Sequence, residues 1–142
     1  MAGFTIRNLR DDVEDMAPRF GLSPGLESRF AREALECEKS GVSYIRVAPG
    51  FRLPFGHRHR VQEELYVLVS GSGRIKLEDE VCDVRQWDVV RIAPEVMRAF
   101  EAGPDGAELI AFGAPAGGPL GQDAEVVQGW WADENGQVPE GR

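Results

Sequence analysis

Short apolar segments separated by turns, between residues 42 and 113, are the feature of this chain that most limits its fold. Each segment is rich in β-branched, aliphatic or aromatic side chains, and glycine, proline or acidic residues separate it from the next. This spacing is typical of an all-β sandwich or barrel, and no βαβ alternation interrupts it. The predicted strands are 42–47, 64–69, 74–79, 80–85, 87–92, 98–100 and 108–113, with a turn at 70–73 and a loop at 101–106.

The residues before this region predict an arm followed by a helix. Residues 1–22 are polar with scattered apolar side chains, which favours an arm with little regular structure. Residues 23–41 predict a helix, because Ser23 can cap its start, Pro24 suits its first turn and Gly41 can end it. Apolar side chains at helical spacing within this segment support the same interpretation.

The residues after the strand region predict a tail. Residues 115–142 begin with a Pro/Gly-rich linker and contain adjacent tryptophans, Trp130 and Trp131. Burial of two indole rings is favourable, so we expect this tail to pack on its own barrel or on a partner. Residues 135–142 are polar and predict disorder.

Composition excludes several classes of partner. The net charge is −8, from 24 acidic and 16 basic residues, which argues against binding to nucleic acids or anionic membranes. No apolar run is long enough to span a bilayer, and the N-terminal residues lack the apolar region of a secretory signal. Cys37 and Cys82 are far apart and form no zinc-knuckle spacing. We expect a cytoplasmic protein with reduced thiols and no nucleic-acid or membrane partner.

Both histidines of the chain, His57 and His59, lie in one short segment. On a strand their side chains point to the same face, and that of Arg58 points to the other. Glu64 opens the next strand, and if the two strands pair through a tight connection its carboxylate is expected on the same inner wall. Two imidazoles and one carboxylate form a set that suits Fe(II), Mn(II) or Zn(II) with open coordination positions. By the same alternation, Glu63 points outward.

This segment resembles the first motif of the cupins. The motif places His-x-His, a few residues, Glu, six residues and Gly in order, which His57, His59, Glu64 and Gly71 match. The resemblance implies an all-β, jelly-roll-like antiparallel barrel, one domain over residues 1–142 and, in many members, a dimer. Its barrel core is expected at about 42–114, with the N-terminal arm and helix at 1–41 and the C-terminal tail at 115–142. It also implies a metal held by His57, His59 and Glu64.

The second cupin motif is matched in spacing but not in its named residues. Arg98 stands where metal-binding cupins have a fourth ligand, a histidine, and this chain has no third histidine. A guanidinium cannot bind a metal. At ~5 Å and an effective dielectric of ~20 it would repel a unit positive charge by about 3 kcal/mol, and a dication by about twice that. Either Arg98 pairs with Glu64 in a metal-free lumen, or a metal binds and Arg98 receives an anionic ligand.

Three functions stay open on these residues. One is a metal-dependent enzyme, of the dioxygenase or isomerase type that cupins include, acting on a small anionic molecule with Fe, Mn, Ni or Zn. The second is a non-catalytic, metal-free binding protein, in which Arg98 holds an acid and the Tyr66 hydroxyl orients it. The third is a stable barrel whose site has lost its role.

By the alternation of side chains along their strands, Leu68 and Phe100 are expected to fill the core. The strand at 64–69 is apolar on both faces, which favours a homodimer.

Overall fold

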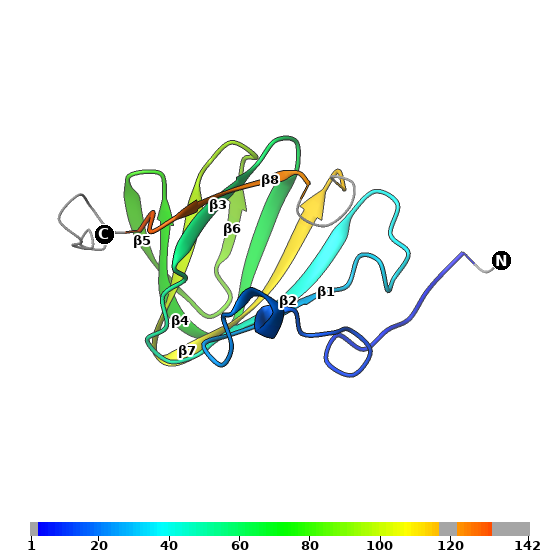
Figure 1. Cartoon of the computed structure of the whole chain (residues 1–142), viewed down its shortest axis with the longest axis horizontal. Helices are drawn as coiled ribbons and strands as arrows, with labels where there is room; N and C mark the ends of the chain where they lie inside the picture. The colour runs from blue at the N-terminus through cyan, green and yellow to red at the C-terminus, as the bar shows by residue number, and fades with distance from the viewer. Residues whose placement is uncertain (1–2, 117–121, 132–142) are drawn as a thin grey trace.

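Eight antiparallel strands form one curled sheet in residues 3–116 and 122–131, which a computed structural model describes (Figure 1). A short 3-10 turn, η1, precedes them at Ala17–Phe20. The strands are β1 (Leu26–Phe30), β2 (Gly41–Val47), β3 (Phe55–His59), β4 (Glu63–Leu77), β5 (Glu80–Arg85), β6 (Val89–Ile92), β7 (Arg98–Ala114) and β8 (Ala124–Gln128). The all-β prediction is therefore confirmed. No helix within these residues is long and apolar enough to cross a membrane.

Two long strands, β4 and β7, pair along most of their length and run through both halves of the curled sheet. The first half of β4 also pairs with β6, and its second half pairs with β5. The second half of β7 pairs with β2, whereas its first residue, Arg98, pairs with His57 on β3. Because each long strand changes partners midway, the sheet turns back on itself and encloses a core.

Glycines allow the bend in these two strands. The pairing of β4 with β7 shifts register on either side of Ser70, and Gly71 has a positive φ of 78°. A Cβ atom at Gly71 would overlap the carbonyl oxygen of Gly106, and one at Gly73 would overlap that of Glu101. Only glycine fits such close approaches of two backbones. The predicted turn at 70–73 and loop at 101–106 were therefore wrong, since both segments lie inside continuous, bulged strands.

The predicted helix at residues 23–41 was also wrong. Residues 26–30 form β1, which pairs in register with β2 from Leu26 opposite Val47 to Phe30 opposite Ser43. Side chains alternate there with a period of two, because Leu26 joins the core while Glu27 faces Arg46 on the outer side. Only a turn around Leu35, whose N–H donates to the Ala31 carbonyl, resembles the predicted helix. Pairing with the open edge of β2 outweighs the local helical pattern.

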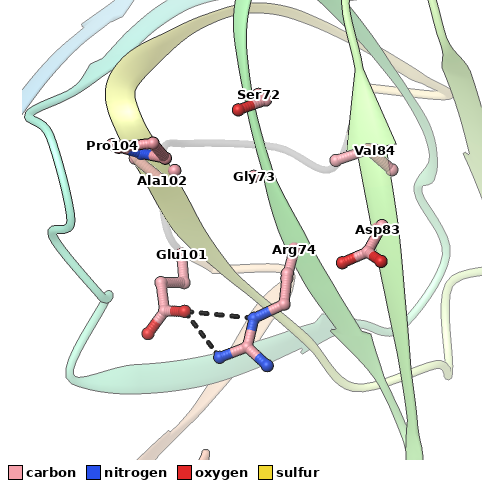
Figure 2. Close-up of a pocket in the computed structure, with 9 residues that line it drawn as sticks. Ser72, Gly73, Arg74, Asp83, Val84, Glu101, Ala102 and Pro104 are labelled. Atoms are coloured by element: carbon pink, nitrogen blue, oxygen red, sulfur yellow. Dashed lines mark hydrogen bonds and ion pairs between the residues drawn. The ribbon is translucent and has the colours of Figure 1, made fainter. Parts of the chain in front are cut away.

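The outer surface of the β4–β7 pair carries charged side chains. Arg74 on β4 and Glu101 on β7 are cross-strand partners joined by a 2.7 Å hydrogen bond (Figure 2). Arg52 also pairs with Glu101. The hollow drawn in Figure 2 lies beside them and also includes Asp83 and Ser72. None of its lining residues belongs to the histidine segment.

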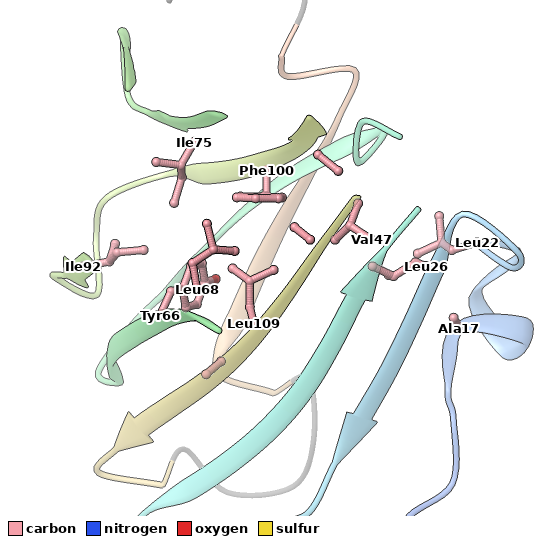
Figure 3. Packing of buried hydrophobic residues seen from close by; sticks show 13 residues of the cluster. Ala17, Leu22, Leu26, Val47, Tyr66, Leu68, Ile75, Ile92, Phe100 and Leu109 are labelled. Atoms are coloured by element: carbon pink, nitrogen blue, oxygen red, sulfur yellow. The ribbon is translucent and has the colours of Figure 1, made fainter. Parts of the chain in front are cut away.

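The enclosed core draws apolar side chains from β1, β2, β4, β6 and β7 and from the arm before β1 (Figure 3). Leu68 and Phe100 are both buried in it, as predicted. Ala17 and Leu22 bring the N-terminal arm into the same cluster. The arm is therefore anchored by burial although it contains little regular structure.

The C-terminal tail packs on its own barrel, one of the two predicted outcomes. Strand β8 pairs with β3 from Phe55 opposite Gln128 to His59 opposite Ala124. Beyond it Trp131 is 2% exposed and packs in a small second cluster with Val81 and Ala99. The sheet thus extends past the predicted 42–114 core, because β1 and β8 belong to it. Residues 135–142, predicted to be disordered, lie outside the described residues.

Candidate metal centre

Strand alternation in β3 aims both imidazoles at the interior. The His57 and His59 rings lie 5.2 Å apart between centroids and are nearly perpendicular, at 88°. Arg58, between them, points outward and donates to Glu125 on β8 at 2.8 Å. His57 is also the cross-strand partner of Arg98, so the two side chains share a face. The structure therefore brings His57, His59 and Arg98 to one wall.

Glu64, at the start of β4, brings a carboxylate between the two rings. Its Oε1 atom lies 3.0 Å from Nε2 of His59 and 3.4 Å from Nε2 of His57. The Tyr66 hydroxyl donates to the same oxygen at 3.3 Å. Glu63, one residue earlier, points outward toward Arg91. The predicted orientations of both glutamates thus agree with the structure.

The distances from the Glu64 carboxylate to the two imidazoles suit a small divalent metal ion, and the three ligand atoms all lie within 4.8 Å of one another. Ligands bound at about 2.1 Å lie about 3.0 Å apart at octahedral angles and about 3.4 Å apart at tetrahedral angles. The two distances from Glu64 to the histidines fall at these values. The Nδ1 and Nε2 atoms of His59 are both buried and make no hydrogen bond among the described residues. This imidazole lies 3.0 and 3.2 Å from two carboxylates without an aligned hydrogen bond to either, and a metal ion at Nε2 would give that nitrogen a directed bond.

Electrostatics also favour a metal-binding form of this cluster. Burial raises the pKa of Glu64, but its contacts with His57 and His59 outweigh burial and hold that pKa well below its usual value. Burial lowers the pKa of His57, with help from Arg98 and His59, against the opposite effect of Glu64. Burial and the nearby Glu64 raise the pKa of Tyr66. Near neutral pH the cluster therefore offers an ionised carboxylate, a neutral imidazole at His57 and a phenol that donates.

Arg98 lies beside this cluster and is completely buried. One guanidinium nitrogen lies 3.9 Å from Oε1 of Glu64, at the outer limit of an ion pair. Its hydrogen bonds go instead to backbone carbonyls, those of His57 at 3.5 Å and Ala93 at 3.2 Å. Its Nε atom has no hydrogen-bond partner among the described residues. The predicted pairing with Glu64 is thus only a long contact, and part of the guanidinium is left unsatisfied.

Asp123, in the tail, is a site residue that the sequence did not reveal. Its Oδ2 atom lies 3.2 Å from Nδ1 of His59, on the side of the ring away from Glu64. Burial raises the pKa of Asp123, but backbone N–H groups of Gln62 and Val61 lower it below the usual value, so the carboxylate is ionised. No local pattern marks this residue, because the pairing of β8 with β3 brings it here from 64 positions away.

Comparison with known proteins rests on structure. Neither a family model nor a curated protein matches the sequence. A cupin protein from Bacteroides fragilis superposes with a TM-score of 0.66 at 24% identity, over 85% of this chain and 92% of that one. The chain has a cupin fold. The jelly-roll-like fold expected from the His57–Gly71 segment is therefore confirmed, without the predicted helix.

Two further structures share this cupin fold. PAC13 from Streptomyces, solved with uridine, matches with a TM-score of 0.70 at 17% identity, over 87% of this chain and 92% of that one. Oxalate decarboxylase from Bacillus subtilis matches with a TM-score of 0.67 at 21% identity, over 85% of this chain but 32% of that one. At these identities the likeness establishes the fold and leaves the reaction to the site's own chemistry.

Proposed function

We propose that this cupin-fold protein binds one divalent metal ion, Fe, Mn, Ni or Zn, through Nε2 of His57, Nε2 of His59 and the Glu64 carboxylate. With that ion it acts as an enzyme of the dioxygenase or isomerase type on a small anionic molecule. The observation that carries the proposal is the His59 imidazole, whose two buried nitrogens make no hydrogen bond among the described residues while Nε2 lies 3.0 Å from Oε1 of Glu64. A bound metal would supply Lewis-acid polarisation of a substrate oxygen.

The charge balance of the cluster supports an anionic ligand. Glu64 and Asp123 are negative and Arg98 is positive, so a divalent ion leaves one positive charge when both imidazoles are neutral. A carboxylate-bearing molecule would neutralise that charge in a partly desolvated site. Among the described residues, the buried Nε–H of Arg98 has no partner and is a donor for such a ligand, and the Tyr66 hydroxyl would serve as a second donor by turning from Glu64.

A metal-free binding protein is the second candidate, and the position of Arg98 favours it. Its guanidinium, 3.9 Å from Oε1 of Glu64, would repel a cation placed beside that carboxylate. In this alternative the positive charge of Arg98 takes the place of the metal charge. The lumen then binds a small acid through Arg98 and Tyr66, or Arg98 closes onto Glu64.

Metal titration separates the two candidates. Protein purified without a histidine tag and stripped with a chelator is titrated with Mn(II) and Zn(II) by calorimetry, as wild type, His59→Ala and Arg98→His. Stoichiometric binding by wild type that is lost in His59→Ala supports the metal site. Binding by Arg98→His alone supports the metal-free candidate. Arg98→His removes a repelling charge and adds a ligand, so its affinity should exceed that of wild type by about tenfold or more. Equal affinities in folded proteins would show that Arg98 does not govern the site.

We also propose that the protein forms a homodimer through the outer face of β4, β6 and β7. Leu65, Val89 and Phe112 are 37%, 59% and 44% exposed, and Leu65 and Phe112 are cross-strand partners on that face. Burying such a patch against its copy would gain hydrophobic free energy. Light scattering at micromolar concentration should give the mass of two chains, and Phe112→Asp should give the mass of one. The mass of one chain for wild type would refute the dimer.

A further inference from the structure

We propose that Asp123 is a positioning residue for the metal site: its carboxylate holds His59 with Nδ1–H toward the tail and Nε2 toward the metal. This inference rests on the proposed metal site, and it assigns a role in that site to a residue of the C-terminal tail. It concerns the His59 ring, whose two nitrogens are buried and make no hydrogen bond in the described part of the chain. Its basis is the pair of carboxylates on opposite sides of that ring, Asp123 at Nδ1 and Glu64 at Nε2.

The Asp123 carboxylate is itself held in place. Its Oδ1 atom accepts the N–H of Val61 at 3.1 Å, and its Oδ2 atom accepts that of Gln62 at 3.1 Å. Its own carbonyl accepts the N–H of Arg60 at 3.0 Å. These three residues form the loop that joins the histidine strand β3 to the glutamate strand β4. Asp123 therefore fixes, through three hydrogen bonds, the loop between β3 and β4, the two strands that supply the three proposed metal ligands.

A carboxylate that faces Nδ1 determines which tautomer the His59 imidazole adopts. A neutral imidazole carries one proton, so an acceptor facing Nδ1 favours the tautomer whose Nε2 lone pair is free. Metal-bound histidines usually donate their other ring N–H to a carboxylate or carbonyl, which fixes the ring and increases its basicity. Asp123 Oδ2 lies 3.2 Å from Nδ1, which is within hydrogen-bond distance for this role. His57 has no described carboxylate other than that of Glu64 in contact with its ring.

The fold places this carboxylate through the tail. Asp123 immediately precedes β8, whose first residue, Ala124, is the cross-strand partner of His59. Strand β8 is followed by the buried Trp131, and the Lys76 ammonium donates to the Trp130 carbonyl at 2.9 Å. These contacts anchor the segment that presents Asp123. The metal site of this chain is thus completed by residues outside the segment that carries its ligands.

The test uses the full chain and a matched control on the same strand. Asp123→Ala is compared with Glu125→Gln, since the Glu125 side chain lies on the outer face in an ion pair with Arg58. Zn(II) affinity is measured by competition with a chelator. We expect a loss of about ten- to a hundredfold in Asp123→Ala and no change in Glu125→Gln. If Asp123→Ala does not fold, Asp123→Asn is used instead, because its amide oxygen can still accept a hydrogen bond from the loop at 60–62. We expect it to lose Zn(II) affinity too, but by a smaller factor than the alanine variant.

Nitrogen-15 spectra of the imidazoles give a readout that a merely structural role would not move. The chain has two histidines, so one His57→Ala spectrum assigns both rings. In Zn(II)-loaded wild type the Nδ1–H signal of His59 should be protected from exchange with water, and Asp123→Ala should abolish that protection. Affinity within twofold of wild type and an unchanged His59 signal, in a folded Asp123 variant, would overturn the role of Asp123 alone. Absence of Zn(II) binding by wild type would overturn the proposed function and this role with it.

Discussion

Two glutamates of this molecule, the buried Glu27 on the outer face of β1 and the partly buried Glu64 in the lumen, have opposite kinds of surroundings. Glu27 accepts a 2.7 Å hydrogen bond from Arg29 and a 3.0 Å bond from Arg46, and Arg10 lies 3.7 Å away. Glu64 faces His59, whose ring makes no hydrogen bond within residues 3–116 and 122–131, and Arg98, whose hydrogen bonds go to backbone carbonyls. Both carboxylates are ionised, but among the described residues Glu27 accepts bonds from two guanidinium groups, whereas Glu64 accepts a single hydrogen bond, from the Tyr66 hydroxyl at 3.3 Å.

The difference distinguishes a structural cluster from a binding site. Around Glu27 the positive charges come from guanidinium groups aimed at the carboxylate, which closes the network without any further group. Around Glu64 the groups are arranged at ligand-to-ligand distances, and two of them stay unsatisfied. Buried polar groups are nearly always hydrogen-bonded, so an open cluster points to a missing partner. Substitutions at the two glutamates should therefore separate stability from binding.

Glu64→Gln should have the largest effect, and on metal binding. The amide removes the negative charge of the only carboxylate in the predicted ligand set. We expect Mn(II) or Zn(II) affinity to fall by about a hundredfold or more, beyond the effect typical of an outer-sphere residue. Calorimetric titration measures it. Glu63→Gln is the matched control, since this neighbouring side chain points outward and should leave affinity unchanged. Equal losses in the two variants would contradict the assignment of Glu64.

Glu27→Gln should act on stability and leave the metal site unaffected. The variant leaves Arg29 and Arg46 facing a neutral amide, and Arg46 is partly exposed, which limits the cost. We expect a loss of about 1–2 kcal/mol in the free energy of unfolding, measured with urea. Glu14→Gln, which removes the exposed pair with Arg19, should cost less than about 0.5 kcal/mol. A change in metal affinity in Glu27→Gln would show that the two clusters are coupled.

The sequence indicated the lumenal site better than the structural cluster. The shared face of His57 and His59 follows from the two-residue period of strands, which needs only local sequence. That Glu64 faces them depends on the fold, because β4 pairs with β5, β6 and β7 and not with β3. Glu27 was placed in a helix, because the apolar spacing of its segment fits a helix as well as a strand. The segment forms a strand because it pairs with the open edge of β2, and local sequence does not specify such a tertiary partner.

Long-range register explains the other omissions. Asp123 reaches His59 only because β8 pairs with β3, and no motif in the tail encodes that pairing. The glycines at 71 and 73 indicated a turn, which is their common role, whereas here they bend β4 where it meets β7. Such positions can be assigned only when the facing backbone is known.

Acid titration of the metal-free protein should show the lumenal site and the Glu27 cluster losing stability in different pH ranges. Of the three predictions in this comparison, this one has the smallest expected effect. Burial lowers the pKa of His57 below its ordinary 6.5. As pH falls, this histidine is therefore protonated in the unfolded state before it is protonated in the folded state. The stability from this group is present above pH 6.5 and is lost as pH falls through the lower, folded pKa. Burial raises the pKa of Glu27, but Arg29 and Arg46 hold it below the ordinary 4.5. Its contribution is therefore complete above pH 4.5 and is lost only below that value.

The free energy of unfolding should thus begin to fall below pH 6.5 and fall further below pH 4.5, by about 1.4 kcal/mol for each unit of pKa difference. His57→Ala should remove the first decrease, and Glu27→Gln should reduce the second. Urea unfolding of the three proteins across this range measures both. A first decrease that persists in His57→Ala would mean that another group of the molecule, and not the lumenal imidazole, causes the loss of stability near neutral pH.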